Sequence, residues 1–204
     1  EDSTTSDNTS TTTDNSSSSS SDNSSSSSSS SGSGIFVAVG DSGNVVRSTD
    51  NGSTSDNATS PTANRLYGVG FGNYTFVTVG DFGNIVRSTD NGSSWDNATS
   101  PTADPLFGLG FGNNTFVAVG DSGNVVRSTD NGSSFDNVTS PTANHLRGIG
   151  FGNNTFVAVG NSGNIVRSTD NGSTFDNVTS PTANHLRGIG FGNNTFVAVG
   201  NSGN

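Results

Sequence analysis

The chain of 204 residues carries seven Arg and no Lys against 17 acidic residues, for a formal net charge of −10. This charge argues against a nucleic-acid partner, which requires a basic face. The absence of Cys excludes disulfides, thiolate nucleophiles and Cys-ligated zinc, and no apolar run approaches the roughly 18 residues of a membrane-spanning helix, so we expect no membrane insertion.

Residues 1–34 consist almost wholly of Ser, Thr, Asp, Asn and Gly. Such a segment buries too little apolar surface to offset the entropy lost on ordering. Two interpretations stay open, a flexible tether and an O-glycosylated Ser/Thr stalk. The chain begins with Glu1 and shows no secretory leader, so we expect a processed or trimmed N-terminus.

Residues 35–204 repeat a unit of about forty residues, the length of one four-stranded blade. In the unit 66–100, residues 66–71 alternate large and small side chains, which predicts a strand with one crowded face. Residues 75–79 are β-branched and aromatic, and residues 85–89 follow after a turn, so both segments are predicted strands. Asn91-Gly92 is the strongest short hairpin signal, and residues 95–99 form the predicted outer strand.

Each full unit carries the pattern Ser-x-Asp-x-Gly-x-x-aromatic at its last hairpin. The Asp residues of the pattern are Asp50, Asp90, Asp130 and Asp170, and its aromatic residues are Trp95, Phe135 and Phe175. In the first copy Ser55 takes the place of the aromatic residue, so we expect that blade to pack less well.

The recurring pattern resembles the Asp-box, or BNR repeat, of bacterial-neuraminidase-type β-propellers. The longer pattern, with Phe-Val-Ala-Val-Gly-Asp-x-Gly-Asn before Arg-Ser-Thr-Asp-Asn-Gly, is similar to that of photosystem II assembly-factor propellers. The resemblance covers residues 35–204. It implies an all-β fold of four-stranded antiparallel blades, with each Asp bonded to turn amides and each aromatic residue packed beneath its hairpin. It implies no catalytic role for the box.

The two ends of the repeat region carry incomplete units. Residues 35–60 supply the second, third and fourth strands of a blade, and residues 186–200 supply a first and a second strand. The strand 186–191 would close a small propeller if it completed the first blade. Because the chain stops at Asn204 inside a predicted turn, a continued, open array is the other expectation.

Catalytic chemistry finds little support in the residue types. The only Glu is Glu1, the Tyr residues are Tyr67 and Tyr74, and no sialidase arginine motif is present. The loop Gly40-Asp41-Ser42-Gly43 resembles a serine-protease nucleophile loop, but the same column reads Asp81-Phe82-Gly83 in the next unit, which favours a turn. Ser-His-Asp catalysis also needs an orienting His, and we expect His145 and His185 to be exposed loop residues.

Metal and cofactor sites are not predicted either. The Asp-rich turns lack a six-to-eight-ligand calcium cage, and turn capping by the Asp side chains explains them. Arg47, Arg87, Arg127 and Arg167 hold one column, where pairing with a neighbouring turn Asp is expected over an anion-binding ring. No cofactor is expected.

Asn-x-Ser/Thr sequons recur three times in each complete unit, at two hairpin tips and on the predicted outer strand. Sugars there would block edge-to-edge strand pairing, so we hypothesise N-glycosylation. The candidate sites are Asn51, Asn57, Asn73, Asn91, Asn97, Asn113, Asn131, Asn137, Asn153, Asn171, Asn177 and Asn193.

Two classes of function follow. The first is a non-enzymatic, extracellular or cell-surface scaffolding protein, glycosylated and self-associating head to tail or in an array. The second is a glycan- or protein-binding module on a Ser-rich stalk. Its candidate ligand surface is the columns that vary between units, namely Tyr67, Phe107, Arg147 and Arg187, with Arg65, Pro105, His145 and His185 beside them. A role in assembling a membrane complex follows from the resemblance alone.

Overall fold

A computed structural model of the chain describes residues 34–203. The tether or stalk predicted for residues 1–34 lies, except for Gly34, outside the described residues. The described part is all-β, with strands in five antiparallel sheets and single 3-10 turns between some of them. None of its helical segments has the length and apolar character needed to cross a membrane.

The sheets follow the forty-residue repeat. The first contains β1 (Phe36–Val39), β2 (Val45–Ser48) and β3 (Asp56–Ala58). The second contains β4 (Leu66–Gly72), β5 (Thr75–Gly80), β6 (Ile85–Ser88) and β7 (Asp96–Asn97). The third contains β8 (Leu106–Gly112), β9 (Thr115–Gly120), β10 (Val125–Ser128) and β11 (Asp136–Val138). The fourth contains β12 (Leu146–Gly152), β13 (Thr155–Gly160), β14 (Ile165–Ser168) and β15 (Asp176–Val178), and the fifth contains β16 (Leu186–Gly192) and β17 (Thr195–Gly200).

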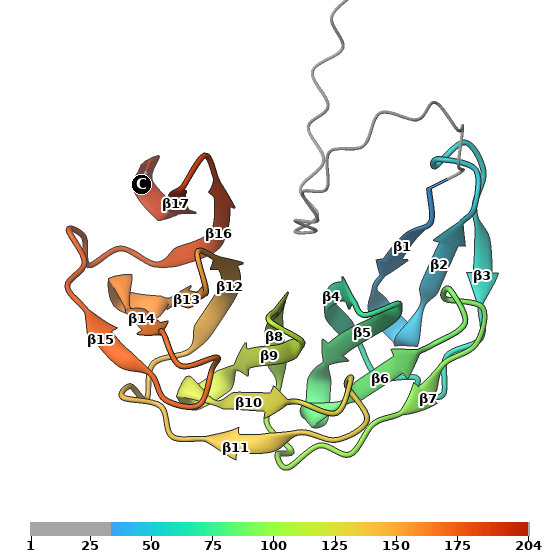
Figure 1. Ribbon diagram of the computed structural model, residues 1–204, viewed down its shortest axis with the longest axis horizontal. Coiled ribbons are helices and arrows are strands. Elements are labelled where there is room, and N and C mark those ends of the chain that lie inside the picture. The colour runs from blue at the N-terminus through green and yellow to red at the C-terminus, as the bar shows by residue number, and fades with distance from the viewer. Residues whose placement is uncertain (1–33, 204) are drawn as a thin grey trace, which may run out of the picture.

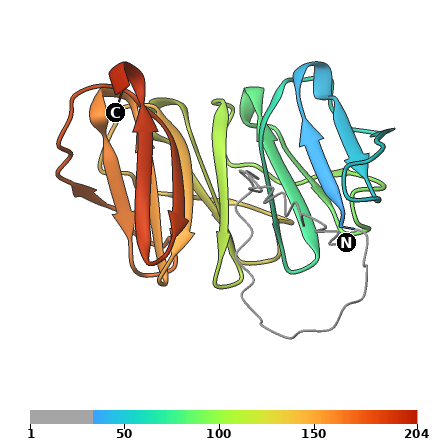
Figure 2. The ribbon, with the colours of Figure 1, turned by 90° about the horizontal axis from the view of Figure 1, so that it is seen from above.

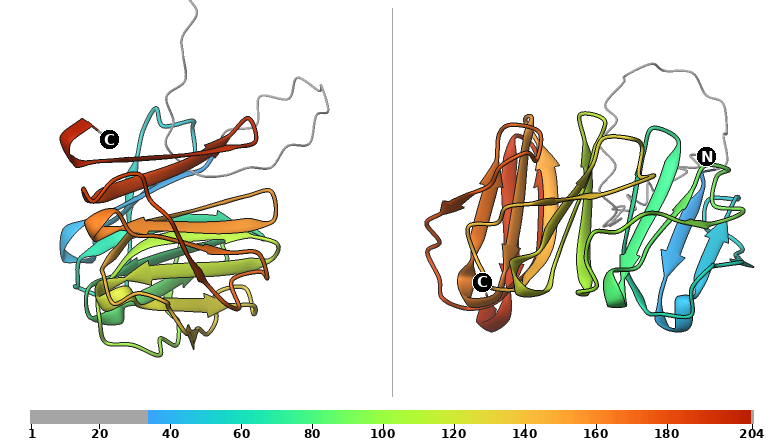
Figure 3. Two further views of the ribbon diagram at one scale, coloured as in Figure 1. Left: turned by 90° about the vertical axis from the view of Figure 1, so that its left-hand side faces the viewer. Right: turned by 90° about the horizontal axis from the view of Figure 1, so that it is seen from below.

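The sheets are propeller-type blades arranged around an arc, which confirms the predicted fold class (Figure 1). Within each complete blade the strands pair in chain order, and β4, β8, β12 and β16 lie next to one another along the inner side of the arc. Seen from above and from below, the blades stand face to face (Figures 2 and 3). The arc is open between the fifth blade and the first, because β16 pairs with β17 and does not complete the sheet of β1.

The hydrophobic core lies between blades. Period-two alternation sends Val77 and Val79 of β5 to the face that meets the third blade, where they pack in one buried cluster with Phe116 and Ala118. Similar clusters fill the junction of the first two blades and that of the third and fourth. Each blade therefore depends on its neighbours for burial, as in other repeat proteins.

Glycine at the ends of the inner strands β4, β8 and β12 allows neighbouring blades to approach closely. A Cβ at Gly72 would lie 2.2 Å from the ring of Phe111 in the next blade, and Gly112 stands in the same relation to Phe151. The crowded face predicted for these strands is thus a stacking surface for the Phe of the following blade.

Candidate functional site

The last hairpin of each blade is built around one carboxylate. Asp90 Oδ1 accepts hydrogen bonds from the backbone N–H groups of Ser93 and Ser94 at 3.0 and 2.9 Å and from the Ser88 hydroxyl at 2.8 Å. The Ser88 hydroxyl oxygen in turn accepts the N–H of Gly92 at 2.9 Å. Asn91 and Gly92 have φ values of 61° and 79°, the left-handed region that this turn requires.

The N–H four residues further on donates to the carboxylate at Asp50, Asp130 and Asp170 as well, and the Ser133 and Ser173 N–H groups also donate to Asp130 and Asp170. Hydrogen bonds from the side chain and backbone of Ser94, together with the Ser88 hydroxyl, lower the pKa of Asp90 to about 2. At Asp130 burial acts to raise the pKa, but the hydrogen bonds from Ser134, Ser128 and Ser133 together outweigh it and the pKa is lowered. These carboxylates are ionised turn caps, with their oxygens already occupied by donors.

The hairpin also joins neighbouring blades. Trp95, Phe135 and Phe175 are buried, with 5, 3 and 6% of their surface exposed, against the preceding blade. The Nε of Arg47 donates to the carbonyl of Asn91 in the next blade at 2.5 Å, and Arg127 donates to the carbonyl of Asn171 at 2.8 Å. For Arg47 and Arg127 the expected pairing with a turn Asp is therefore wrong, because the oxygens of each box Asp are occupied by donors of its own turn and these two Arg residues donate to a backbone carbonyl.

A bulge in each inner strand projects the second residue of that strand out of the ladder. Leu66 pairs with Gly80 and Gly68 pairs with Val79, which leaves Tyr67 as the extra residue. Phe107, Arg147 and Arg187 occupy the bulge position in the next three blades. Bulges re-aim side chains, so the four variable residues of the predicted ligand surface share one place in the fold.

Tyr67, Phe107 and Arg147 contact one another across blades, and with Arg65 at one end and Arg187 in the same position of the fifth blade they form a row, called here the bulge row. The Arg65 guanidinium lies 5.0 Å from the centre of the Tyr67 ring, and Tyr67 meets Phe107 edge to face at 5.4 Å. The Arg147 guanidinium lies over the Phe107 ring, 4.5 Å from its centre. The row thus places two adjacent aromatic rings between two guanidinium groups.

Each bulge residue that carries a donor has an acceptor in the 3-10 turn of its own blade. The Tyr67 hydroxyl donates to Asp81 at 2.8 Å, while Arg147 donates to Asn161 at 3.2 Å and Arg187 donates to an Asn. Burial, together with the bond and charge of Asp81, raises the pKa of Tyr67, so it remains a neutral donor.

Charge changes along the row. Asp41 pairs with Arg65 at 2.7 Å at the start of the row. Within residues 34–203, Arg147 and Arg187 have no carboxylate partner, because Asn161 and Asn201 stand where the earlier blades have Asp. The row has an aromatic centre and one end with uncompensated positive charge.

The two His residues lie in loops, as expected, but these loops are at blade junctions, so each His is partly and not fully exposed. The Nδ1 of His145 accepts the backbone N–H of Ser122 in the preceding blade at 3.2 Å and also contacts a carboxylate oxygen of Asp121. The Nδ1 of His185 accepts the N–H of Ser162 at 2.9 Å. The link to each Ser runs through its backbone, as in a turn, and not through the hydroxyl that a nucleophile would use.

The described residues, 34–203, contain no group of three or more His, Asp or Glu placed to hold a metal ion. The predicted sequon Asn residues fall in three places. Asn57, Asn97, Asn137 and Asn177 lie exposed on the outer strands, and Asn73, Asn113, Asn153 and Asn193 lie exposed at inner hairpin tips. Asn51, Asn91, Asn131 and Asn171 lie in the box turns, where Asn131 and Asn171 donate to Thr75 and Thr115 at 2.6 Å.

Column variation located the bulge row, but sequence reasoning missed its acceptors. The sequence pattern identifies Asp81 and Asn161 only as turn residues. A paired change marks them, because Arg replaces the aromatic bulge residue in the same units where Asn replaces the turn Asp. No residue type at these positions indicates from the sequence that the inner strands contain a bulge.

No protein-family model matches the sequence, and no curated protein matches it. Several solved structures are similar to the structure of this chain. The structure titled YCF48 bound to D1 peptide has a TM-score of 0.63 and 19% identity, over 81% of this chain and 56% of that one. A structure of a nidogen/laminin complex has a TM-score of 0.60 and 14% identity, over 76% of this chain and 65% of that one.

An ancestral GH74 enzyme has a TM-score of 0.61 and 20% identity, over 75% of this chain and 26% of that one. The chain thus spans less than two thirds of the length of each of these proteins. At such identities the likeness shows the fold alone, and that fold is the β-propeller.

Proposed function

We propose that the protein is a non-enzymatic, protein-binding propeller module and that the bulge row is its binding surface. The observation that carries the proposal is the contact of Arg65, Tyr67, Phe107 and Arg147 with one another across three blades. Tyr and Arg are the side chains enriched at binding hot spots, since they combine apolar area with directed polar groups. The binding named in the YCF48 structure, to a peptide, supports the same class of function.

The chemistry of the row defines the partner segment. The Tyr67–Phe107 pair offers an aromatic surface, and Arg147 and Arg187 offer guanidinium groups without a competing carboxylate in the described part. A partner peptide with an apolar or aromatic side chain followed by a carboxylate matches this order, because Arg binds carboxylates in a bidentate fork.

A displayed library of random peptides, selected on the full chain, tests the proposal. Enriched peptides are measured by calorimetry against the wild type, against Tyr67→Ala/Phe107→Ala/Arg147→Ala, and against Thr89→Ala/Thr129→Ala/Thr169→Ala. The Thr residues are exposed on the box hairpins, so they control for a change in three side chains. We expect the affinity for the peptide to fall at least about tenfold in the Tyr67→Ala/Phe107→Ala/Arg147→Ala variant and to stay unchanged in the Thr variant. Equal loss in both variants, or no saturable binder, would refute the proposal.

We further propose an extracellular or cell-surface location with N-glycans on the outer strands. Asn57, Asn97, Asn137 and Asn177 support this, since each is exposed on the outermost strand of its blade. The amides of Asn131 and Asn171 are held by bonds to the other blades, which disfavours sugars there. Intact-mass measurement of the secreted protein before and after glycosidase tests it, and a mass of 20.5 kDa before treatment contradicts it.

A second candidate is a scaffolding protein that self-associates head to tail. The uncovered faces of the end blades favour it, because Phe36 is 48% exposed at one end and Val197 and Val199 are 59 and 54% exposed at the other. Sedimentation at rising concentration tests it. We expect association that Val197→Asp abolishes, while a monomer at every concentration excludes the scaffold.

A further inference from the structure

The second blade carries a large aromatic residue in a turn where the next two blades carry a small one. Phe82 lies in the 3-10 turn after the second strand of this blade, and Ser122 and Ser162 hold the same position in the third and fourth blades. All three residues have a positive φ, between 53° and 57°. The left-handed region is unfavourable for a bulky side chain. Phe82 therefore strains a turn that accepts Ser more readily.

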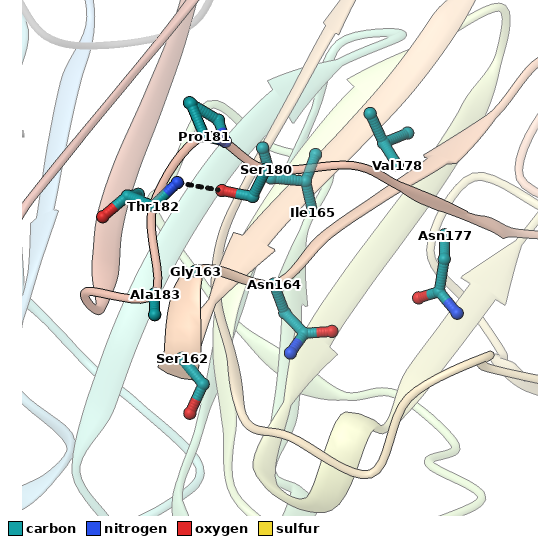
Figure 4. Close-up of a pocket in the computed structure, with 10 residues that line it drawn as sticks. All are labelled: Ser162, Gly163, Asn164, Ile165, Asn177, Val178, Ser180, Pro181, Thr182 and Ala183. Atoms are coloured by element: carbon teal, nitrogen blue, oxygen red, sulfur yellow. Dashed lines mark hydrogen bonds between the residues drawn. The ribbon is translucent and has the colours of Figure 1, made fainter.

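The Phe82 side chain gains little burial in return for this strain, since 70% of its surface is exposed. The turn is held by its backbone, because a Cβ at Gly83 would lie 1.9 Å from the carbonyl oxygen of Thr102 in the linker to the next blade. Figure 4 shows the corresponding turn of the fourth blade, with Ser162 next to the linker residue Ala183. The fold thus requires the turn and the linker but not an aromatic ring.

The turn brings Phe82 next to the bulge row. Asp81, the residue before it, accepts the Tyr67 hydroxyl at 2.8 Å. The backbone N–H of Asp81 donates to the carbonyl of Arg65 at 2.9 Å. Phe82 therefore follows directly after the residue that bonds to both Arg65 and Tyr67, at the same end of the second blade.

A neighbouring position changes together with Phe82. The backbone N–H groups of Ser122 and Ser162 each donate to a His of the following blade. Pro105 holds the position of that His in the blade that follows Phe82, two residues before Phe107. The polar Ser and His of the later junctions are thus replaced by two apolar residues at the junction that carries the aromatic pair of the row.

We propose that Phe82 is a specificity-determining residue of the bulge row and forms a second apolar subsite for the partner peptide. This inference rests on the binding function proposed for the row. One apolar side chain of the peptide covers the Tyr67–Phe107 pair, and a second covers the Phe82 ring. The partner is therefore a segment with two large apolar side chains and one acidic residue. A strained, exposed aromatic residue that repays its cost only on binding fits this role.

The charges around the row orient the peptide. The subsite at Phe82 and Pro105 offers no side-chain hydrogen-bond donor, so removal of water from apolar surface drives binding there. The carboxylate of Asp81 lies beside this subsite and repels an acidic group. The acidic residue of the peptide is thus directed to the other end of the row, at Arg147.

Tyr74 provides a matched control in the same blade. It also has a positive φ, of 58°, it stands where the next two blades have Asn, and it is 85% exposed. It lies in the hairpin between β4 and β5, at the opposite end of these strands from the turn of Phe82. Tyr74→Asn and Phe82→Ser each restore the residue of the later blades and remove one exposed aromatic ring, but only Phe82→Ser changes the bulge row.

Peptides selected from a displayed random library on the full chain are the probes. Each is titrated by calorimetry into the wild type, Phe82→Ser, Tyr74→Asn and Tyr67→Ala/Phe107→Ala/Arg147→Ala. Each is also synthesised with its large apolar residues replaced by Ala one at a time. We expect Phe82→Ser to lower the affinity at least about fivefold and Tyr74→Asn to leave it unchanged. One of the Ala replacements should weaken binding to the wild type but not to Phe82→Ser.

Urea denaturation separates this role from a structural one, because the midpoint of Phe82→Ser should not fall below that of the wild type. Unchanged affinity in Phe82→Ser, with loss in the triple variant, would overturn the subsite and leave the proposed function standing. Equal loss in Phe82→Ser and Tyr74→Asn, a lower urea midpoint in Phe82→Ser, or selected peptides with a single apolar residue would also overturn it. No binder, or no loss in the triple variant, would refute the proposed function and the subsite with it.

Discussion

The carboxylate of each box turn accepts more hydrogen bonds than any other side chain of its blade. Asp130 Oδ1 takes three, from the Ser133 and Ser134 N–H groups and the Ser128 hydroxyl, and Oδ2 takes a fourth from the Ser134 hydroxyl at 2.6 Å. Bonds to an ionised acceptor are stronger than those between neutral groups. The turn geometry is therefore set by one residue.

Replacing Asp130 by Asn removes the charge and one acceptor oxygen while keeping the shape. We expect the free energy of unfolding to fall by about 1–2 kcal/mol. Chemical denaturation measures the change. Asp136→Asn is the control, since Asp136 is exposed and its side chain makes no hydrogen bond among the described residues, and an equal loss there would contradict the prediction.

The box carboxylates also determine how stability depends on pH. Hydrogen bonds from Thr54 and Ser48 lower the pKa of Asp50 to about 2, and similar bonds lower those of Asp90 and Asp170 to about 2. A pKa lower in the folded chain than in the unfolded chain means that folding favours the ionised form. This contribution is complete above about pH 4 and is lost as pH falls toward about pH 2.

We therefore expect urea midpoints to drop between about pH 4 and pH 2. In the variant with Asn at Asp50, Asp90, Asp130 and Asp170 the midpoint should start lower and change less over the same range. A drop of equal size in the variant would show that other groups cause the acid sensitivity.

At the scale of the hairpin, the glycine of the box turn both adopts a left-handed backbone conformation and leaves room for the preceding blade. Gly52 and Gly132 both occupy the second position of the box turn, with φ values of 82° and 78°. A Cβ at Gly132 would lie 2.7 Å from Val77 Cγ2 in the preceding blade, whereas a Cβ at Gly52 meets nothing within 4 Å. No blade precedes the first one among the described residues, so the box turn of the first blade packs against no neighbouring blade.

This pair separates backbone strain from blade packing. Gly52→Ala should cost about 1 kcal/mol of unfolding free energy, from the left-handed conformation alone. Gly132→Ala should cost about 1–3 kcal/mol more, because the methyl group overpacks the junction. Chemical denaturation of both variants measures the two losses of unfolding free energy. Equal losses would mean that Gly132 is not closely packed against the preceding blade.

At the scale of the whole molecule, identical sequences meet different surroundings. The segment Thr-Phe-Val-Ala-Val-Gly occurs in β9, β13 and β17. Val117 in β9 is fully buried between blades, and Val197 at the same position of β17 is 59% exposed. Position in the arc, and not local sequence, decides which residue belongs to the core.

Truncation at these two positions measures that difference directly. Val117→Ala should lower the free energy of unfolding by about 2 kcal/mol, through lost burial and a cavity. Val197→Ala should change it by about 0.5 kcal/mol or less in the monomer. A large loss at Val197 at low protein concentration would show that another surface covers β17.

The repeat, its turns and its alternating strands determined the blades, because these features act over a few residues and recur in register. The variable columns also indicate Tyr67, Phe107 and Arg147, which the structure places in contact. Tertiary structure alone decided that the arc stays open, that Arg47 bonds to a carbonyl and not to an Asp, and that His145 joins two blades. The physical reason is that burial and pairing between blades depend on which blade comes next, which no single forty-residue unit encodes.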